Sequence, residues 1–450
     1  IYDNHAKRSF EEASINTIIV IFKRPEGKHL ADNLTRFVAF KKPFEVVIDE
    51  DNLKAIANAE EKLKTEDFRC VPLTQGELWN DGVAGEDTKQ AEITGSEFIG
   101  NYAGNKWGGK YLRAPDIFFT ILEKGKGKLV RLGDVADVRR GFTTGANEFF
   151  YVEDVTDKNP DLSRVENIKD LQTIEEIREA GLRVVKPSKF KRMDKDYKLF
   201  LVEEEFLITV LKSAKDSKKI AVSEDELSTK LFYCHNEREE LNHTSVRDYI
   251  DWGERIEFIP KISVKGTTRW WDVGMKSPTD AIILRRIGER MPFFESNGIL
   301  EDCCLFGIKR KNDTVNKTVF LSILNSTWVR MYVELMTRQL TGAQAVADTN
   351  VYVVKEALIL KPEILEDNIV NRIIGTYNIL KKREALSIFK ECGIDPSKPI
   401  REQEPDPLPD RKELDDIFFD ELGLTEEERK EVYWSVCELV KQRLEKARSL

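Results

Sequence analysis

Residues 131–150 have the sequence RLGDVADVRRGFTTGANEFF. A short apolar segment leads into the basic pair Arg139-Arg140, and a turn rich in Gly and Thr follows at residues 141–147. Two guanidinium groups therefore stand beside hydroxyl groups and backbone N–H groups. Groups of these kinds bind phosphate oxygens and the edges of bases. The stretch thus predicts a loop that contacts a nucleic acid.

Length and composition indicate a folded protein of two or three domains. The chain has 450 residues, of which 41% are hydrophobic and 34% are charged, as in globular proteins. No apolar run approaches the roughly 18 residues that span a membrane, and no signal-peptide pattern is present. The six cysteines include no Cys-x-x-Cys pair, which is typical of reduced thiols. We therefore expect a cytoplasmic protein without a membrane partner.

Cys234, His235 and His243 come closest to a metal-binding pattern. A structural zinc site needs a closed set of four ligands. A fourth ligand and a regular spacing are both absent from this stretch. We therefore expect no metal site.

The net charge of −9 argues against a nucleic-acid binder, but the charge is unevenly distributed. Residues 401–450 hold 9 Lys and Arg against 15 Asp and Glu, whereas residues 181–220 hold 11 against 6 and residues 261–290 hold 7 against 3. A site-specific protein needs one basic face rather than an overall basic charge. The two basic regions fit either such a face or an ordinary solvated surface.

Five apolar residues follow one another at 18–22, and Lys-Arg-Pro ends the run. Such a run predicts a strand that is buried on both faces of a central α/β sheet. The chain begins with Ile1, and too few residues precede the strand to form that sheet. We therefore expect an N-terminal part of the protein to be absent from this chain.

The remaining sequence divides at a break and a linker. The sequence KGKGK at residues 124–128 predicts a flexible domain boundary. Short strands and long loops follow from 129 to 362, with one clear helix at 318–336. The pattern is mostly helical from 363 onward, apart from a proline-rich linker at 396–409.

Local patterns predict where several helices begin and end. Residues 51–63 favour a helix, and Pro115 fits the first turn of another. Gly423 ends an apolar stripe, and Thr425 with Glu428 forms a capping box for the last helix.

Six separated segments resemble, in the same order, those of one enzyme family. They are residues 14–23, 107–124, 131–151, 321–326, 340–345 and 408–448. The family is the N6-adenine DNA methyltransferases of restriction–modification systems that carry a TaqI-like specificity domain. By the match at residues 14–23, Phe22 would stack on an adenine extruded from the duplex. Phe22 equally fits the end of a core strand.

The catalytic motifs of this family are absent. The chain contains Asn159-Pro160-Asp161 but no Asn-Pro-Pro-aromatic motif, and it has no Gly-rich turn for S-adenosylmethionine. The resemblance therefore implies that the intact enzyme uses S-adenosylmethionine through a missing N-terminal catalytic domain. We expect this chain alone to bind no cofactor, to hold no catalytic residue and to transfer no methyl group.

Some family members also carry a fused nuclease domain. Pro409-Asp410 followed by Glu428-Arg429-Lys430 matches a PD…ExK nuclease pattern. That chemistry needs acidic groups on adjacent strands around Mg²⁺. Because Glu428 is expected in the first turn of a helix, we interpret the match as accidental.

The candidate DNA contacts combine cations, hydroxyl groups and amides. Arg can pair with guanine, Gln with adenine, and hydroxyl groups with phosphate. The candidates are Arg139, Arg140, Thr143, Thr144, Lys265, Thr267, Thr268, Arg269, Arg338, Gln339 and Gln344. Trp270 and Trp271 lie beside Arg269, and we expect one of them in the core.

The predicted fold class is therefore α/β and α+β. Residues 1–125 would be the tail of a Rossmann-like methyltransferase domain, residues 129–362 a mixed α+β target-recognition domain, and residues 363–450 a helical region. The predicted function is sequence-specific recognition of double-stranded DNA. It would place an adenine before the active site of the missing N-terminal half.

Two other functions remain open. A non-catalytic DNA-specificity subunit of a restriction–modification complex would also recognise DNA, but such subunits usually repeat the recognition domain and only one is found here. A protein-binding scaffold would explain the acidic tail. Arg139 and Arg269 on one basic face would favour DNA, and their scatter over the surface would favour the scaffold.

Overall fold

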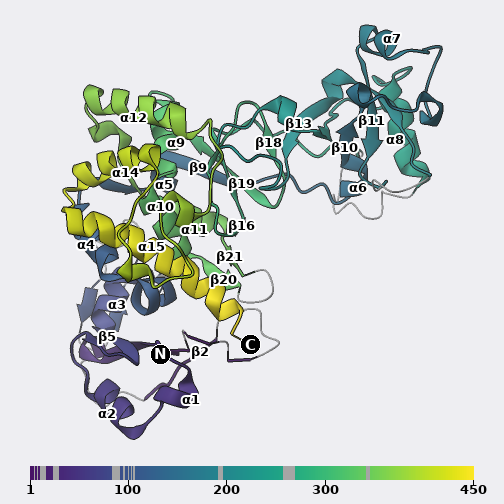
Figure 1. The fold of residues 1–450 in the computed structure, drawn as a ribbon. Coiled ribbons are helices and arrows are strands. Elements are labelled where there is room, and N and C mark those ends of the chain that lie inside the picture. Colours follow the sequence, from purple (N-terminus) through teal and green to yellow (C-terminus); the bar gives the residue numbers. More distant parts are fainter. Residues whose placement is uncertain are drawn as a thin grey trace.

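The structure is a computed structural model of the chain. It describes residues 1–4, 6–7, 9–10, 17–23, 30–83, 92–94, 97–99, 101–102, 104, 107–190, 196–256, 269–340 and 345–449. A body of helices and sheets carries a smaller lobe on one side (Figure 1). The predicted α/β and α+β class is confirmed, because helices accompany mixed and antiparallel sheets. Among the described helices, none combines the length and the apolar character that a membrane span requires.

A mixed sheet forms the N-terminal part, with the strand order β2-β1-β3-β5-β4. Its strands are β1 (Tyr2–Asp3), β2 (Ile18–Ile19), β3 (Leu34–Phe40), β4 (Leu63–Lys64) and β5 (Phe68–Thr74), and its helices are α1 (Phe44–Val47), α2 (Glu50–Asn58) and α3 (Gln75–Gly82). β1 and β3 are parallel, and the other pairs are antiparallel. The helix predicted at 51–63 therefore ends early, since the chain turns into β4.

The prediction of a strand buried on both faces at residues 18–22 is wrong. Only Ile18–Ile19 forms a strand, β2, which pairs with β1 at the edge of the sheet. All five side chains are exposed, and Phe22 is 89% exposed. An apolar run predicts burial only where a second layer covers it, and an edge strand has a single neighbour. Residues 14–16, which open the matched segment, lie outside the described residues.

The body is built on an antiparallel sheet with the order β17-β15-β19-β9. Its strands are β9 (Ala136–Arg140), β15 (Ala281–Leu284), β17 (Phe294–Glu295) and β19 (Leu305–Arg310). A two-stranded sheet pairs β8 (Leu129–Arg131) with β22 (Leu358–Leu360). A three-stranded sheet has the order β16 (Arg286–Ile287), β21 (Val346–Asp348) and β20 (Arg338–Leu340). The helices are α4 (Asp116–Lys124), α5 (Leu132–Val135), α9 (Lys317–Leu324), α10 (Thr327–Met336), α11 (Val351–Lys355), α12 (Asp367–Leu380), α13 (Ile388–Glu391), α14 (Pro409–Leu422) and α15 (Glu426–Ala447).

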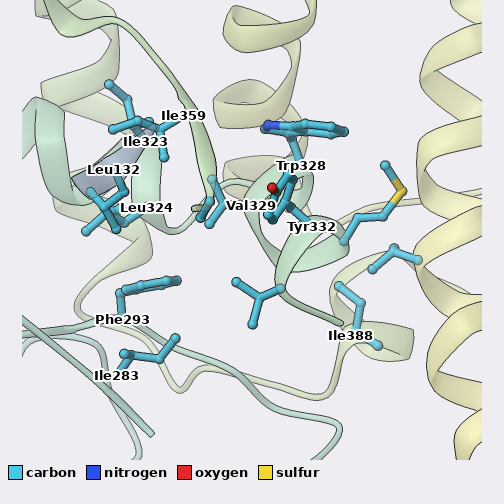
Figure 2. Close-up of a cluster of buried hydrophobic side chains, with 14 of the residues drawn as sticks. Leu132, Ile283, Phe293, Ile323, Leu324, Trp328, Val329, Tyr332, Ile359 and Ile388 are labelled. Carbon is cyan, nitrogen blue, oxygen red and sulfur yellow. The ribbon is translucent and has the colours of Figure 1, made fainter. Parts of the chain in front are cut away.

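One large apolar cluster fills the body. Figure 2 shows part of it, where Trp328, Val329 and Tyr332 of α10 lie near Ile323 and Leu324 of α9. The single helix predicted at residues 318–336 is thus two helices. The break has a tertiary cause: the side-chain amide of Asn325 exchanges two hydrogen bonds of 3.0 Å with the backbone of Phe293. Ser326 then caps α10.

The helical C-terminal region follows its local pattern closely. Gly423 ends α14 in the left-handed conformation, with φ at 66°. Thr425 and Glu428 form both hydrogen bonds of the predicted capping box at the start of α15. Asp410 lies in the first turn of α14 and pairs with Arg383. The PD…ExK residues therefore lie on two helices and do not form a nuclease site.

The lobe is formed mainly by the described part of residues 142–273. Its sheet has the order β12-β11-β10-β14-β13-β18. The elements are α6 (Asn147–Phe150), β10 (Tyr151–Asp154), α7 (Ile174–Glu179), β11 (Leu182–Pro187), β12 (Phe200–Glu203), β13 (Leu207–Leu211), β14 (Thr229–Phe232), α8 (Ser245–Arg255) and β18 (Leu300–Glu301). Trp270 and Trp271 both belong to the lobe core. The sequence predicted that only one of them would be buried, which was an underestimate.

The turn at residues 124–128 is held by hydrogen bonds to the C-terminal helices. Lys124 donates to the carbonyl of Gly423 at 2.9 Å and pairs with Glu428, while Lys128 donates to the carbonyl of Glu421 at 2.6 Å. The core of the body contains residues from all three predicted segments. The division into domains at residues 1–125, 129–362 and 363–450 stays a prediction.

Buried ion pairs join α15 to the rest of the body. The side chains of Arg443 and Glu334 are both fully buried, and their Nε and Oε1 atoms lie 2.6 Å apart. Arg330 pairs with the other oxygen of Glu334 at 3.0 Å. Burial alone would raise the pKa of Glu334, but Arg443 and Arg330 hold it below its ordinary value. Removing one partner would leave part of this charge without compensation.

We expect Arg443→Ala to lower the free energy of unfolding by about 3–5 kcal/mol, because it breaks a buried ion pair. Urea unfolding would measure the change. The matched control is Arg372→Ala, whose pair with Glu413 is about half exposed and should contribute less than about 1 kcal/mol. Equal losses in the two variants would contradict this assignment.

A second network predicts acid sensitivity. Glu391 accepts hydrogen bonds from Arg383 and from the backbone of Leu386 and pairs with Arg411. Burial opposes ionisation of this carboxyl, but these donors lower its pKa from 4.5 to about 2. Because the pKa is lower in the folded protein, ionised Glu391 stabilises the fold above pH 4.5. That contribution disappears as the pH falls toward 2.

We therefore expect the wild type to lose more stability than Glu391→Gln between pH 5 and pH 2. Thermal unfolding across this range would show the difference, and the exposed Glu363→Gln would serve as control. Parallel pH profiles for the wild type and Glu391→Gln would disprove the role of this carboxylate.

Candidate nucleic-acid interface

Strand β9 positions the loop at residues 139–147. It pairs with β19 so that Arg139 lies opposite Gly307 and Arg140 opposite Phe306. Ala136 and Val138 point into the core, and because side chains alternate along a strand, Arg139 lies on the other face. In Figure 1, β9 and β19 lie where the lobe leaves the body.

Gly141 lets the loop approach residues 301 and 302 closely. Phe142 donates its N–H to the carbonyl of Glu301 at 2.8 Å. A Cβ atom on residue 141 would lie 2.2 Å from the carbonyl oxygens of both Glu301 and Asp302. Since these are backbone atoms, only glycine fits here without a shift of one segment.

Arg139 is held by a buried carboxylate. Its Nε lies 3.2 Å from Oε1 of Glu301, whose side chain is fully buried, and one Nη donates to the carbonyl of Ser277. Oε2 of Glu301 has no hydrogen-bond partner among the described residues. Burial raises the pKa of Glu301, although Arg139 and Lys276 oppose the shift.

Arg140 and Lys276 complete a group of three cations, which we call the basic junction: Arg139, Arg140 and Lys276. Arg140 is exposed, and its Nε donates to the carbonyl of Cys303 at 2.9 Å. Lys276 donates to the carbonyl of Arg140 at 2.9 Å and lies 4.6 Å from the ring centre of Phe142. Burial lowers the pKa of Lys276, and the carboxylate of Glu301 opposes this shift. The three cations of the basic junction thus lie together at the base of the lobe.

The two threonines of the loop differ in the exposure of their hydroxyl groups. Thr143 is exposed, so its hydroxyl group is accessible to a phosphate. Thr144 is buried, and its hydroxyl donates to Oδ1 of Asn147 at 2.5 Å. The predicted contact by Thr144 is therefore not supported, because the hydroxyl group is used to shape the loop.

A series of contacts connects Arg269 to the basic junction. The backbone N–H of Lys276 donates to the hydroxyl of Tyr233 at 2.9 Å, and the rings of Tyr233 and His235 lie 4.3 Å apart. Arg269 donates to the carbonyl of His235 and pairs with Asp272 at 3.1 Å. Arg269 is thus linked to the basic junction indirectly, through His235 and Tyr233. Its predicted companions Lys265, Thr267 and Thr268 lie outside the described residues.

The predicted DNA contacts in the body are less accessible or already paired. Arg338 is 61% exposed and pairs with Asp348 at 2.7 Å. Gln339 is 4% exposed, so its predicted base contact is incorrect: its side chain lies inside the body. Gln344 is outside the described residues. Phe22 is accessible on the N-terminal sheet, and its stacking role stays a prediction.

Sequence reasoning missed Glu301 and Lys276. Lys276 lies within the basic stretch at 261–290 but carries no motif of its own. Glu301 is one of many acidic residues, and only the tertiary contacts of β18 with Arg139 and Phe142 show that it lies beside Arg139. No local pattern would have identified it.

Asp302, Cys303 and Cys304 bring their potential metal ligands within 4.8 Å of one another. Both oxygens of Asp302 already accept hydrogen bonds, one from Tyr151 at 2.6 Å and one from the backbone of Cys304 at 2.8 Å. Burial and the Asp302 carboxylate raise the pKa of Cys304 to about 11. With Asp302 engaged and the pKa of Cys304 raised, these three residues fall short of the closed set of four ligands in a structural zinc site.

The comparisons with known proteins gave matches among solved structures. No protein-family model and no curated protein sequence matches the chain. Among solved structures, the chain is similar to the type IIG restriction endonuclease BpuSI, with 13% sequence identity and a TM-score of 0.43. The match covers 92% of this chain and 40% of that protein, so the chain spans less than half the length of the endonuclease.

We expect Gly141→Ala to destabilise the fold by about 1–3 kcal/mol, the usual cost of added volume in a tightly packed position. Urea unfolding would measure it. Gly375→Ala is the matched control, since Gly375 lies on the exposed side of α12 with no atom within 4 Å of an added Cβ. That change should stabilise the helix by about 1 kcal/mol. Unchanged stability of Gly141→Ala would show that residues 301–302 do not hold the loop.

Proposed function

We propose that this chain is the DNA-recognition part of an adenine-N6 DNA methyltransferase of a restriction–modification system. The observation that carries the proposal is the basic junction at the base of the lobe. Arg140 is exposed there, Arg139 is partly exposed, and Thr143 adds an accessible hydroxyl. Such groups bind phosphates and base edges of a duplex.

The contacts suggest a division of roles within the loop. Within the described residues, Arg140 is anchored through Nε, which leaves its outer N–H groups for a phosphate. Lys276 stabilises the loop, because its ammonium group donates to the carbonyl of Arg140 and lies over the ring of Phe142. Arg269, which already pairs with Glu237 and Asp272, would extend the contact only by exchanging these carboxylates for a phosphate. Binding by these cations would release counterions and weaken with salt.

Methyl transfer is assigned to an N-terminal half that this chain lacks. S-adenosylmethionine would supply the methyl group there, and the adenine amino nitrogen would receive it. The polar groups of the described groove on α12 and α14 do not favour this cofactor. A groove of about 720 Å³ lies between α12 and α14, but its carboxylates, Glu413 and Asp410, are already paired with Arg372 and Arg383.

Selection from a pool of randomised duplex DNA would test the proposal. We expect this chain to enrich one short site and its affinity to fall steeply as salt rises. Arg140→Ala should weaken binding about equally for all sequences and reduce the salt slope by about 1, as the loss of one phosphate contact does. Arg372→Ala, a change of the same type on α12, should leave binding unchanged.

The opposite result would be equally informative. If the chain shows no sequence preference in this selection, or binds without salt dependence, it is not a recognition domain. N6-methyladenine in the selected site, formed by the intact protein with S-adenosylmethionine, would test the methyltransferase assignment separately.

A further inference from the structure

Arg139 differs from a typical surface arginine because two sides of its guanidinium group are fixed. Nε faces the Glu301 carboxylate at 3.2 Å, and Nη2 donates to the carbonyl of Ser277. Nη1 makes no hydrogen bond to a described residue. The side chain is 32% exposed. The outer edge of the guanidinium group is therefore held in a defined direction while its outer N–H groups remain available.

The fold provides a specific place for the carboxylate that holds Arg139. Gly307, which pairs with Arg139 across the strands, has no side chain, and a Cβ there would lie 2.3 Å from Oε1 of Glu301. A methyl group of Thr279 closes the same space. The carboxylate thus occupies a position that only glycine at 307 leaves open. A fully buried carboxylate needs a cation nearby, and Arg139 supplies it.

Arg140, the next residue in the chain, is held less tightly than Arg139. The one anchor of Arg140 among the residues that the structure describes is the carbonyl of Cys303, and its side chain is exposed. A flexible guanidinium group suits a phosphate, which accepts hydrogen bonds from many directions. A guanidinium group that is fixed in its plane suits a base edge, because a guanine presents O6 and N7 as two acceptors at a set spacing.

We propose that Arg139 recognises a guanine in the major groove of the duplex and that Glu301 is the positioning residue that sets the plane of its guanidinium group. The assignment rests on the proposed function and specifies what the chain recognises: its site contains a G·C pair read by Arg139. Glu301 does not touch the DNA. It acts through Arg139, and Gly307 makes room for it.

Two variants separate this role from a structural one. Glu301→Gln keeps the shape and the acceptor oxygen but removes the charge that orients Arg139. The double variant Arg139→Ala with Glu301→Gln removes the guanidinium group without leaving a buried charge unpaired. Arg140→Ala is the matched control from the same loop. Circular dichroism and thermal unfolding would confirm that each variant is folded.

Each protein would be subjected to selection from randomised duplex DNA, followed by affinity measurements on the selected site and on single-base changes. In wild type, one G·C pair should be preferred by about tenfold or more, within the range of a bidentate contact. The double variant should lose preference at this position only. Glu301→Gln should weaken the same preference with an unchanged salt slope. Arg140→Ala should keep the preference and lose affinity for every sequence.

Three outcomes would overturn the assignment. If the double variant selects the same site, Arg139 does not read a base. If it loses affinity equally for all sequences, Arg139 contacts a phosphate, and if Glu301→Gln keeps the full preference, the carboxylate does not position it. Failure of wild type to select any site would instead overturn the proposed function itself, and the wild-type selection alone reveals it.

Discussion

The close approach of residues 141 and 142 to residues 301 and 302 is the constraint on which the candidate interface depends. Here β9 ends, β18 joins the sheet of the lobe, and the chain passes from body to lobe. Two glycines make the approach feasible: Gly141 admits the backbone of the second segment, and Gly307 admits the side chain of Glu301. The position of the basic junction relative to both parts is therefore fixed by backbone packing and not by the cations themselves.

Three buried carboxylates, Glu334, Glu391 and Glu301, differ in how fully their oxygens are engaged. Glu334 and Glu391 have both oxygens engaged by arginines or backbone donors, and the pKa of each lies below its ordinary value. Glu301 has one oxygen engaged and one without a partner in the described part of the chain, and its pKa is raised. The first two stabilise packing between helices. The third is the costlier arrangement, which is understandable if its effect on Arg139 serves binding.

The sequence predicted features that depend on neighbouring residues and missed those that depend on distant ones. The capping box at Thr425 and the left-handed end at Gly423 need only a few adjacent residues, and both formed as predicted. The split between α9 and α10 depends on Phe293, which is far from Asn325 in sequence. For the same reason Arg139 and Arg140 could be selected from their motif, whereas Glu301, Thr144 and Gln339 needed the strand register and the burial that the fold creates.

The acidic C-terminal region, which suggested a protein-binding scaffold, has an internal explanation. Asp410 pairs with Arg383, Glu413 with Arg372, Asp420 with Arg429, and Glu431 and Glu438 with Arg401. These carboxylates pair with cations of neighbouring elements, so much of the negative charge is compensated where it lies. Charges separated by more than about 10 Å are largely screened at moderate salt. A net charge of −9 therefore says little about the potential at the basic junction, where the local cations decide which partner is attracted.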